Sequence, residues 1–275
     1  MMRSLCFVFV LVGCTAPTVG VGEGEGEGEG ELLSESEPND GAIVSDVNAL
    51  PIDAVITGSF GSAGDTDFFA VATRAGGFYR VTLEVPPGSL LDGHLTILDS
   101  GRGGDAAGED YVRLGRGPEG SGAVLEMVAF GAGHLVIVRD ARAVDGDAQG
   151  SDEHTYQLHI EASELPSEPL AFPSSIDGAL PDVGGVSLYA FDAVEDADFT
   201  VDLVAAGDLD ARLFVFSVDQ GDWVARNDDR VFGEDVNPLM DAFFPLGGPS
   251  LLIVESTAER ATNLGYRLTT SGNAP

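Results

Sequence analysis

The side chains best suited to chemistry in this sequence are oxygen donors gathered in two short acidic clusters. The first cluster ends a glutamate-rich segment, and the second directly precedes an apolar segment. The candidate ligands in them are Glu35, Glu37, Asn39, Asp40, Asp65 and Asp67. Calcium binds about six to eight oxygen atoms at flexible angles, and carboxylates and amides supply them. Alternate residues of an extended segment face the same side, so Glu35, Glu37 and Asn39 would point together. We therefore predict a calcium site that ties the first cluster to the second.

The same clusters have a simpler interpretation, because acidic residues are common throughout this chain. The first would be a solvated acidic turn, and Asp65-Thr66-Asp67 would be a hairpin loop. Asp67 would then cap the loop by accepting a backbone hydrogen bond instead of binding a metal. The sequence leaves the two interpretations open.

Catalytic motifs are absent from the sequence, and we expect no enzyme activity. It contains neither a G-x-S-x-G nucleophile elbow nor an H-E-x-x-H zinc motif. Its four histidines are His94, His134, His154 and His159. The last two have an odd spacing, which would place them on opposite faces of a strand.

The N-terminus has the features of an export signal. A basic residue precedes the apolar run Leu5 to Val12, which is too short to span a bilayer. The run leads into Leu11-Val12-Gly13-Cys14, which resembles the lipobox of bacterial lipoproteins. The resemblance implies cleavage after Gly13, so that residues 1–13 are a signal peptide and Cys14 carries lipid. The alternative is a plain secretory signal cut near Ala16.

Cysteine usage and the next residues extend this picture. Cys6 and Cys14 are the only cysteines, so the region beyond the leader has no disulfide. By resemblance to Gram-negative sorting rules, Thr15 after the cysteine favours the outer membrane over the inner one. We expect a lipid-anchored protein of the cell envelope, in the outer membrane or on the cell surface. Residues 14–34 would form a disordered tether, since residues 22–31 read GEGEGEGEGE.

The overall charge limits the possible partners. The formal net charge is -33, and all 13 basic residues are arginine. So acidic a chain repels phosphate backbones and anionic bilayer surfaces, which argues against nucleic acid and leaves membrane attachment to the lipid. Divalent cations are its natural counterions. The hydrophobic fraction of 44% rules out general disorder beyond the tether.

The folded region appears twice in the sequence. Ile56-Thr57-Gly58 and Ile176-Asp177-Gly178 lie 120 positions apart, and the next two apolar segments keep that offset. Tyr156-Gln157-Leu158 and Tyr266-Arg267-Leu268 close the two copies. The segments run about four to eight residues, are rich in β-branched and aromatic residues, and are separated by Gly, Pro and Asp clusters. We predict an all-β protein with two tandem antiparallel jelly-roll-like sandwiches, over residues 35–162 and 176–272, joined by a linker at residues 163–175.

The first copy resembles a known family. Glu35-Ser36-Glu37-Pro38-Asn39-Asp40, then Val55-Ile56-Thr57-Gly58, then Asp65-Thr66-Asp67-Phe68-Phe69 resemble the bacterial pre-peptidase C-terminal domain. That family includes the collagen-binding domains of clostridial collagenases. The resemblance implies a jelly-roll sandwich, an accessory role beside secreted proteins and, often, calcium ligated from positions like these.

The second copy departs from the pattern. Ser187 stands at the position of Asp67, and no acidic motif precedes Ile176, so we expect no equivalent calcium site. An acidic loop that contains Asn227-Asp228-Asp229 and Glu234-Asp235 follows Trp223; we expect it to be solvated, with a second metal site as the alternative. Trp223 is the single tryptophan, expected in a core unless it is exposed for stacking on a sugar or a collagen-like surface.

Together these observations favour a non-catalytic binding protein of the cell envelope. Its first sandwich would be stabilised by calcium, and it would bind an extracellular or envelope protein or polysaccharide. Two alternatives remain: an accessory subunit or inhibitor of a separately encoded secreted hydrolase, and a purely structural envelope protein.

Overall fold

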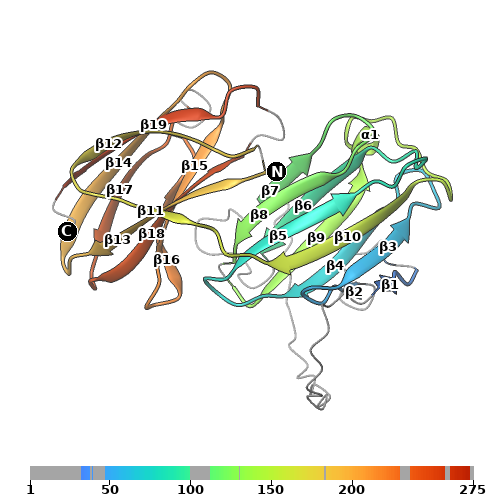
Figure 1. Cartoon of the computed structure of the whole chain (residues 1–275), viewed down its shortest axis with the longest axis horizontal. Helices are drawn as coiled ribbons and strands as arrows, with labels where there is room; N and C mark the ends of the chain where they lie inside the picture. Colours follow the sequence, from blue (N-terminus) through green and yellow to red (C-terminus); the bar gives the residue numbers. More distant parts are fainter. Residues whose placement is uncertain are drawn as a thin grey trace, which may run out of the picture.

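A computed structural model describes residues 32–37, 39, 47–99, 112–129, 131–182, 184–229, 236–257 and 261–272. The predicted signal peptide, the predicted lipidation site Cys14 and the candidate ligand Asp40 lie outside these residues, as does Glu234-Asp235. The described part consists of β-strands and one short helix, α1 (Ala141–Val144), arranged as two sandwiches side by side (Figure 1). The predicted all-β fold class is confirmed. No helix within these residues is long and apolar enough to cross a membrane.

The first sandwich is formed by strands β1 to β10, in two five-stranded sheets. The strands are β1 (Leu32–Ser34), β2 (Asn48–Ala49), β3 (Val55–Ser59), β4 (Thr66–Ala72), β5 (Phe78–Glu84), β6 (Gly93–Asp99), β7 (Val112–Arg116), β8 (Ala123–Val128), β9 (Gly133–Asp140) and β10 (Thr155–Ala162). One sheet has the order β1-β3-β10-β5-β8, and the other has the order β2-β4-β9-β6-β7.

The second sandwich is formed by strands β11 to β19. The strands are β11 (Ser167–Pro169), β12 (Ser174–Ala179), β13 (Val186–Ala193), β14 (Ala197–Ala205), β15 (Ala211–Ser217), β16 (Asp222–Asn227), β17 (Leu239–Phe244), β18 (Gly248–Ser256) and β19 (Gly265–Gly272). Its sheets have the orders β12-β19-β14-β17 and β11-β13-β18-β15-β16.

Both sandwiches have the strand order of a jelly roll. The eight strands from β3 to β10 can be numbered one to eight in chain order. One sheet then has the order 1-8-3-6, and the other has the order 2-7-4-5. The eight strands from β12 to β19 give the same two series. Two Greek keys folded onto one another produce this order. The sequence repeat is therefore a repeat of topology, to which β1, β2 and β11 are additions.

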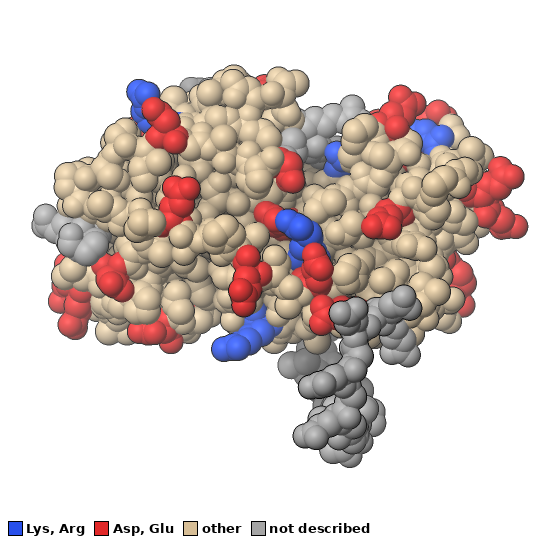
Figure 2. Space-filling view, viewed as in Figure 1, with Lys and Arg blue, Asp and Glu red and all other residues tan. Residues whose placement is uncertain are grey.

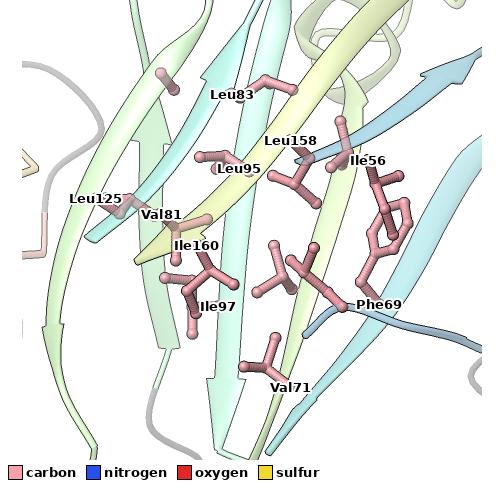
Figure 3. Close-up of a cluster of buried hydrophobic side chains, with 14 of the residues drawn as sticks. Ile56, Phe69, Val71, Val81, Leu83, Leu95, Ile97, Leu125, Leu158 and Ile160 are labelled. Atoms are coloured by element: carbon pink, nitrogen blue, oxygen red, sulfur yellow. The ribbon is translucent and has the colours of Figure 1, made fainter. Parts of the chain in front are cut away.

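Alternating side chains build the core of each sandwich. In β5, Tyr79, Val81 and Leu83 are buried while the residues between them are more exposed, as expected for a strand with one face on a core. Side chains from the two sheets of the first sandwich, such as Val81 and Leu95, meet in the interior shown in Figure 3. The second core instead contains a group of packed phenylalanines: Phe172, Phe191, Phe199 and Phe244.

Two expected boundaries differ from the structure. Leu32–Ser34, predicted to end the tether, forms β1 and pairs in parallel with β3, because Leu33 packs against the first core. The segment 163–175, predicted to be a linker, contributes β11, which pairs in parallel with β13. The second sandwich thus begins before residue 176.

An apolar patch joins the two sandwiches. Val128 of β8 packs with Leu188, Phe214 and Phe216 of the second sandwich, all of them buried. Trp223, expected in a core or exposed, is half-buried beside this patch and stacks on Phe214 with ring centroids 5.9 Å apart. Burial of this surface favours one fixed arrangement of the sandwiches over two independent domains.

A buried ion pair crosses the same interface. The guanidinium of Arg113 in β7 lies 2.6 Å from the carboxylate of Glu255 in β18, and each side chain is only 1% exposed. Arg113 also donates a hydrogen bond of 2.7 Å to the carbonyl of Gly184. Arg212 forms a second ion pair with Glu255. A buried pair tolerates little displacement, since a charge that loses its partner stays desolvated.

Removing one member of this pair should destabilise the protein. We expect Glu255→Ala to lower the free energy of unfolding by about 3–5 kcal/mol, because Arg113 stays buried without its carboxylate. Urea unfolding followed by the fluorescence of Trp223, the single tryptophan, measures the change. The double variant Arg113→Met, Glu255→Leu should recover part of the loss, since the fully buried guanidinium of Arg113 is gone, while Arg212, which also loses Glu255, is 12% exposed and keeps access to water. A loss below about 1 kcal/mol in the single variant would contradict the role given to the pair.

Candidate metal centre

The segment that follows β1 carries the first acidic cluster onto the first sandwich. The parallel pairing of β1 with β3 continues past Ser34, because the Glu35 N–H donates to the carbonyl of Thr57 at 3.0 Å. The Glu35 carboxylate in turn accepts the Ser59 N–H at 2.5 Å. Backbone pairing therefore fixes Glu35 over the end of β3.

The second cluster contributes a fully buried carboxylate. Asp67 is the second residue of β4 and is 0% exposed. The hydroxyl of Tyr156, in β10, lies 2.5 Å from an Asp67 oxygen and 2.7 Å from a Glu35 oxygen. A phenol has one proton and can donate to only one carboxylate at a time. The other contact needs a proton on a carboxyl group or a positive charge nearby.

Three carboxylates converge at this point. One oxygen from each of Glu35, Glu37 and Asp67 lies within 4.8 Å of the other two. A cation among them would neutralise their mutual repulsion, and carboxylate oxygens are the ligands that calcium prefers.

The side chain of Asn39 completes the inner surface of the site. Asn39 is 0% exposed, and its amide lies 2.7 Å from Asp67 Oδ1 and 3.1 Å from Glu37 Oε2. With its nitrogen toward them, the amide donates to both carboxylates and accepts from Asn48 at 2.9 Å. With its oxygen toward the two carboxylates, the Asn39 amide adds a fourth oxygen to those of Glu35, Glu37 and Asp67. Oxygens that are all acceptors repel one another, so this arrangement requires a cation between them.

Electrostatics at Asp67 favour the neutral acid in the metal-free protein. Burial, together with the nearby negative charges of Glu35, Asp65 and Glu37, raises the pKa of Asp67 to about 9, against the lowering effect of the hydrogen bond from Tyr156. Burial also raises the pKa of Tyr156, and the negative charges of Asp67 and Glu35 add to the effect. Tyr156 therefore acts as a neutral donor, and near neutral pH Asp67 ionises only when a positive charge compensates it.

The contrast with other buried acids is direct. Asp92 pairs with Arg116 at 2.7 Å, and Asp140 pairs with Arg142 at 2.5 Å. Around Asp67, the described partners are Tyr156, Asn39 and other carboxylates, none of them basic. The site thus has the chemistry of a cation-binding centre, and the donor set fits calcium.

The structure brings together most of the predicted ligands that it describes. Glu35, Glu37 and Asp67 form the group of three, and Asn39 adjoins it. Asp65 does not belong to that group. Its carboxylate accepts the backbone N–H of Thr66 at 3.0 Å, so Asp65 makes the loop-capping hydrogen bond that the simpler interpretation gave to Asp67.

Sequence reasoning missed Tyr156 and Gly58 as parts of the site. A methyl group added to Gly58 would lie 2.3 Å from Tyr156 Cζ and 2.5 Å from a Glu35 oxygen, so only glycine lets the phenol reach the carboxylates. The signal was present in the repeat, since Gly178 and Tyr266 stand in the same relation. The repeated glycine and tyrosine indicated that the two residues pack together in each sandwich. They did not indicate which groups the tyrosine hydroxyl would contact.

The second sandwich carries a neutral version of the site. Tyr266 corresponds to Tyr156, and its hydroxyl lies 2.8 Å from that of Tyr189. Ser187 takes the place of Asp67, and its hydroxyl donates to the carbonyl of Ala179. Within the described residues, only the first sandwich has a group of three metal-ligating side chains.

Comparisons with known proteins give weak similarities. No family model and no curated protein matches the chain. Among solved structures, the pre-peptidase C-terminal domain of a Bacillus anthracis collagenase is 12% identical over 40% of this chain and 100% of its own, with a TM-score of 0.32. PliG of Aeromonas hydrophila, a periplasmic inhibitor of g-type lysozyme, is 20% identical over 39% of this chain and 96% of its own, with a TM-score of 0.31. These values do not assign the chain to a family.

The raised pKa of Asp67 predicts how pH affects the metal-free protein. Between the ordinary value of 3.8 and the folded value of about 9, the folded state holds a proton that the unfolded state has released. The free energy of unfolding should therefore fall as pH rises through this window, by at most about 1.4 kcal/mol per pH unit. Urea unfolding with chelator at several pH values measures the slope.

The matched variant for this measurement is Asp67→Asn. It keeps the shape of the side chain and cannot ionise, so the slope should become shallower. An unchanged slope in Asp67→Asn would show that other groups cause the pH dependence.

Proposed function

We propose that this protein is a non-catalytic, lipid-anchored component of the cell envelope. Its first sandwich binds calcium, and the protein binds an extracellular or envelope protein or polysaccharide. The observation that carries the calcium assignment is the buried Asp67 carboxylate, which lies among other carboxylates with no basic residue among its described partners.

Calcium at this site would fasten the start of the folded region. Glu35 and Glu37 belong to the segment after β1, whereas Asp67 belongs to β4 of the opposite sheet. A cation held by all three links the N-terminal segment to both sheets. Asn39 would supply a further oxygen, and Asp40 and Asp65 remain proposed ligands from the sequence.

The anchored role is supported by the order of segments along the chain. The lipobox-like motif precedes a tether rich in glycine and glutamate, and the tether leads directly into β1. Force or motion at the tether would therefore act first on β1 and on the acidic cluster beside it. A metal that fixes this junction stabilises the point where the folded region meets the membrane attachment.

Calcium should raise the melting temperature of the protein. With a dissociation constant of about 10 μM, about 1 mM calcium would add about 2.7 kcal/mol to the stability of the folded state. That corresponds to a rise of about 5–10 °C relative to a chelator-treated sample. Differential scanning calorimetry of the full chain in detergent measures the shift.

Two variants test the origin of this shift. Asp67→Asn should lose the response to calcium and melt higher than the unmodified protein in chelator, because it no longer buries an ionisable group. Asp192→Asn removes one exposed acidic charge away from the site and should keep the full response. Equal shifts in both variants would mean that calcium acts through the overall negative charge.

Lipid attachment should depend on one of the two cysteines. In bacterial cells fed an alkyne fatty acid, the protein should incorporate the label and partition into the membrane fraction. Cys14→Ser should abolish both properties, since the thioether has no sulfur to form on. Cys6→Ser is the matched control and should leave labelling intact. Labelling that survives in Cys14→Ser would exclude the proposed anchor.

A further inference from the structure

The two sandwiches differ at one sheet edge. In the first, β1 pairs in parallel with the outer edge of β3, so that the sheet has five strands. In the second, the equivalent sheet has four strands and stops at β12, the counterpart of β3. No strand in the described part of the chain pairs with the outer edge of β12.

The reason for the difference lies in the chain connections. β1 comes from a segment that precedes the first sandwich and is separated from β2 by residues 35–47. The second sandwich follows the first directly, since β10 ends at Ala162 and β11 begins at Ser167. This short connection has no segment that could supply a second β1.

The backbone of β12 is positioned to accept such a strand. In the first sandwich, the Thr57 carbonyl accepts the Glu35 N–H, so this residue of β3 directs its backbone outward. Asp177 is its counterpart, because Thr57 pairs with Gln157 of β10 and Asp177 pairs with Arg267 of β19 in the same register. The N–H and carbonyl of Asp177 therefore face away from the sheet, as the polar groups of an edge strand do.

The side chains of β12 also leave a place for an incoming residue. Leu33 lies opposite Ile56 and packs against the first core, and Ile56 is 2% exposed. Ile176 occupies the same position in the second sandwich but is only half-buried. An aliphatic side chain at the Leu33 position of an added strand would cover it.

The charge beside β12 favours a basic segment as the added strand. Asp177 is exposed on the solvent face of β12, next to the place that Ser34 takes beside Thr57. Its ion pair with Arg267 is itself exposed, with the two side chains 63% and 74% accessible, so an incoming basic residue can share the carboxylate at little loss. Acidic side chains also predominate over both sandwiches in the view of Figure 2, in keeping with the net charge of -33.

We propose that the outer edge of β12 binds an extended, cationic peptide segment of a partner protein. The segment lies parallel to β12, with an aliphatic residue facing Ile176 and a basic residue next to it, beside Asp177. Strand addition of this kind draws affinity from main-chain hydrogen bonds and specificity from alternate side chains. The inference gives a site to the proposed binding role and rests on that role, but it depends on neither calcium nor the lipid. A second copy of the chain is a poorer occupant, because two bodies of charge -33 repel each other.

The probe is a fluorescein-labelled octapeptide, Ser-Arg-Val-Leu-Arg-Thr-Arg-Ser, titrated by fluorescence anisotropy into the full chain in detergent, in chelator and in calcium. Binding should be seen in both conditions, which separates this result from the calcium tests. Replacing the leucine and valine of the peptide by serine, with the charge unchanged, should weaken binding at least tenfold. Equal binding of the two peptides would mean attraction by charge alone and would overturn the proposal.

The matched protein variants are Asp177→Ala and Asp177→Pro. Alanine removes the charge and keeps the outward N–H, and should weaken binding by a few fold. Proline removes that N–H without breaking a bond to β19, and should weaken binding at least tenfold relative to alanine. Urea unfolding checks that each variant folds, and Ile176→Ala, which should also weaken binding, replaces the proline variant if it does not.

Two outcomes would overturn the assignment. One is equal affinity of the alanine and proline variants, which would place the peptide away from the β12 edge. The other is a dimer in sedimentation experiments that Asp177→Pro dissociates, which would make a second copy the occupant.

Discussion

The burial of the Glu255 carboxylate determines how the two sandwiches are joined. A carboxylate removed from water needs a compensating charge, and Arg113 from the other sandwich provides it at 2.6 Å. The surrounding apolar patch excludes water and makes the requirement stricter. Short loops must then approach closely: a methyl group on Gly184 would lie 1.9 Å from the Val124 carbonyl. The two sandwiches therefore meet through a buried ion pair and an apolar patch, which favour one relative arrangement.

The same constraint gives Asp67 its significance. The other buried carboxylates considered above have arginine partners, and Asp67 has a phenol, an amide and further carboxylates instead. A carboxylate kept in such surroundings holds a proton, or it holds a cation, and the three converging carboxylates favour the cation.

Much of this could be predicted from the sequence, for identifiable reasons. Alternation in segments such as residues 78–84 predicts a strand directly, and the offset of 120 positions predicts two copies of one fold. The spacing of Glu35 and Glu37 predicts that both face one side, and one oxygen of each lies within 4.8 Å of the other in the structure. Tyr156 could not be assigned to the site, because its approach depends on the pairing of β3 with β10 across a long stretch of chain. The interface could not be predicted either, since Arg113 and Glu255 are far apart in the sequence and belong to different sandwiches.

The chain connections account for the differences between the two sandwiches. Each sandwich has a glycine near the end of its first jelly-roll strand, Gly58 in β3 and Gly178 in β12. A tyrosine side chain from the neighbouring strand packs directly on each of them. Where a free segment precedes the copy, as at β1, the edge is covered and acidic side chains reach the tyrosine. The second sandwich follows directly from the first, so no such segment precedes it. Ser187 stands there in place of the aspartate, and the hydroxyls of Tyr189 and Tyr266 form a hydrogen bond with each other. The acidic cluster and the covered edge therefore occur together in the first sandwich, and the open edge accompanies the pair of tyrosines in the second.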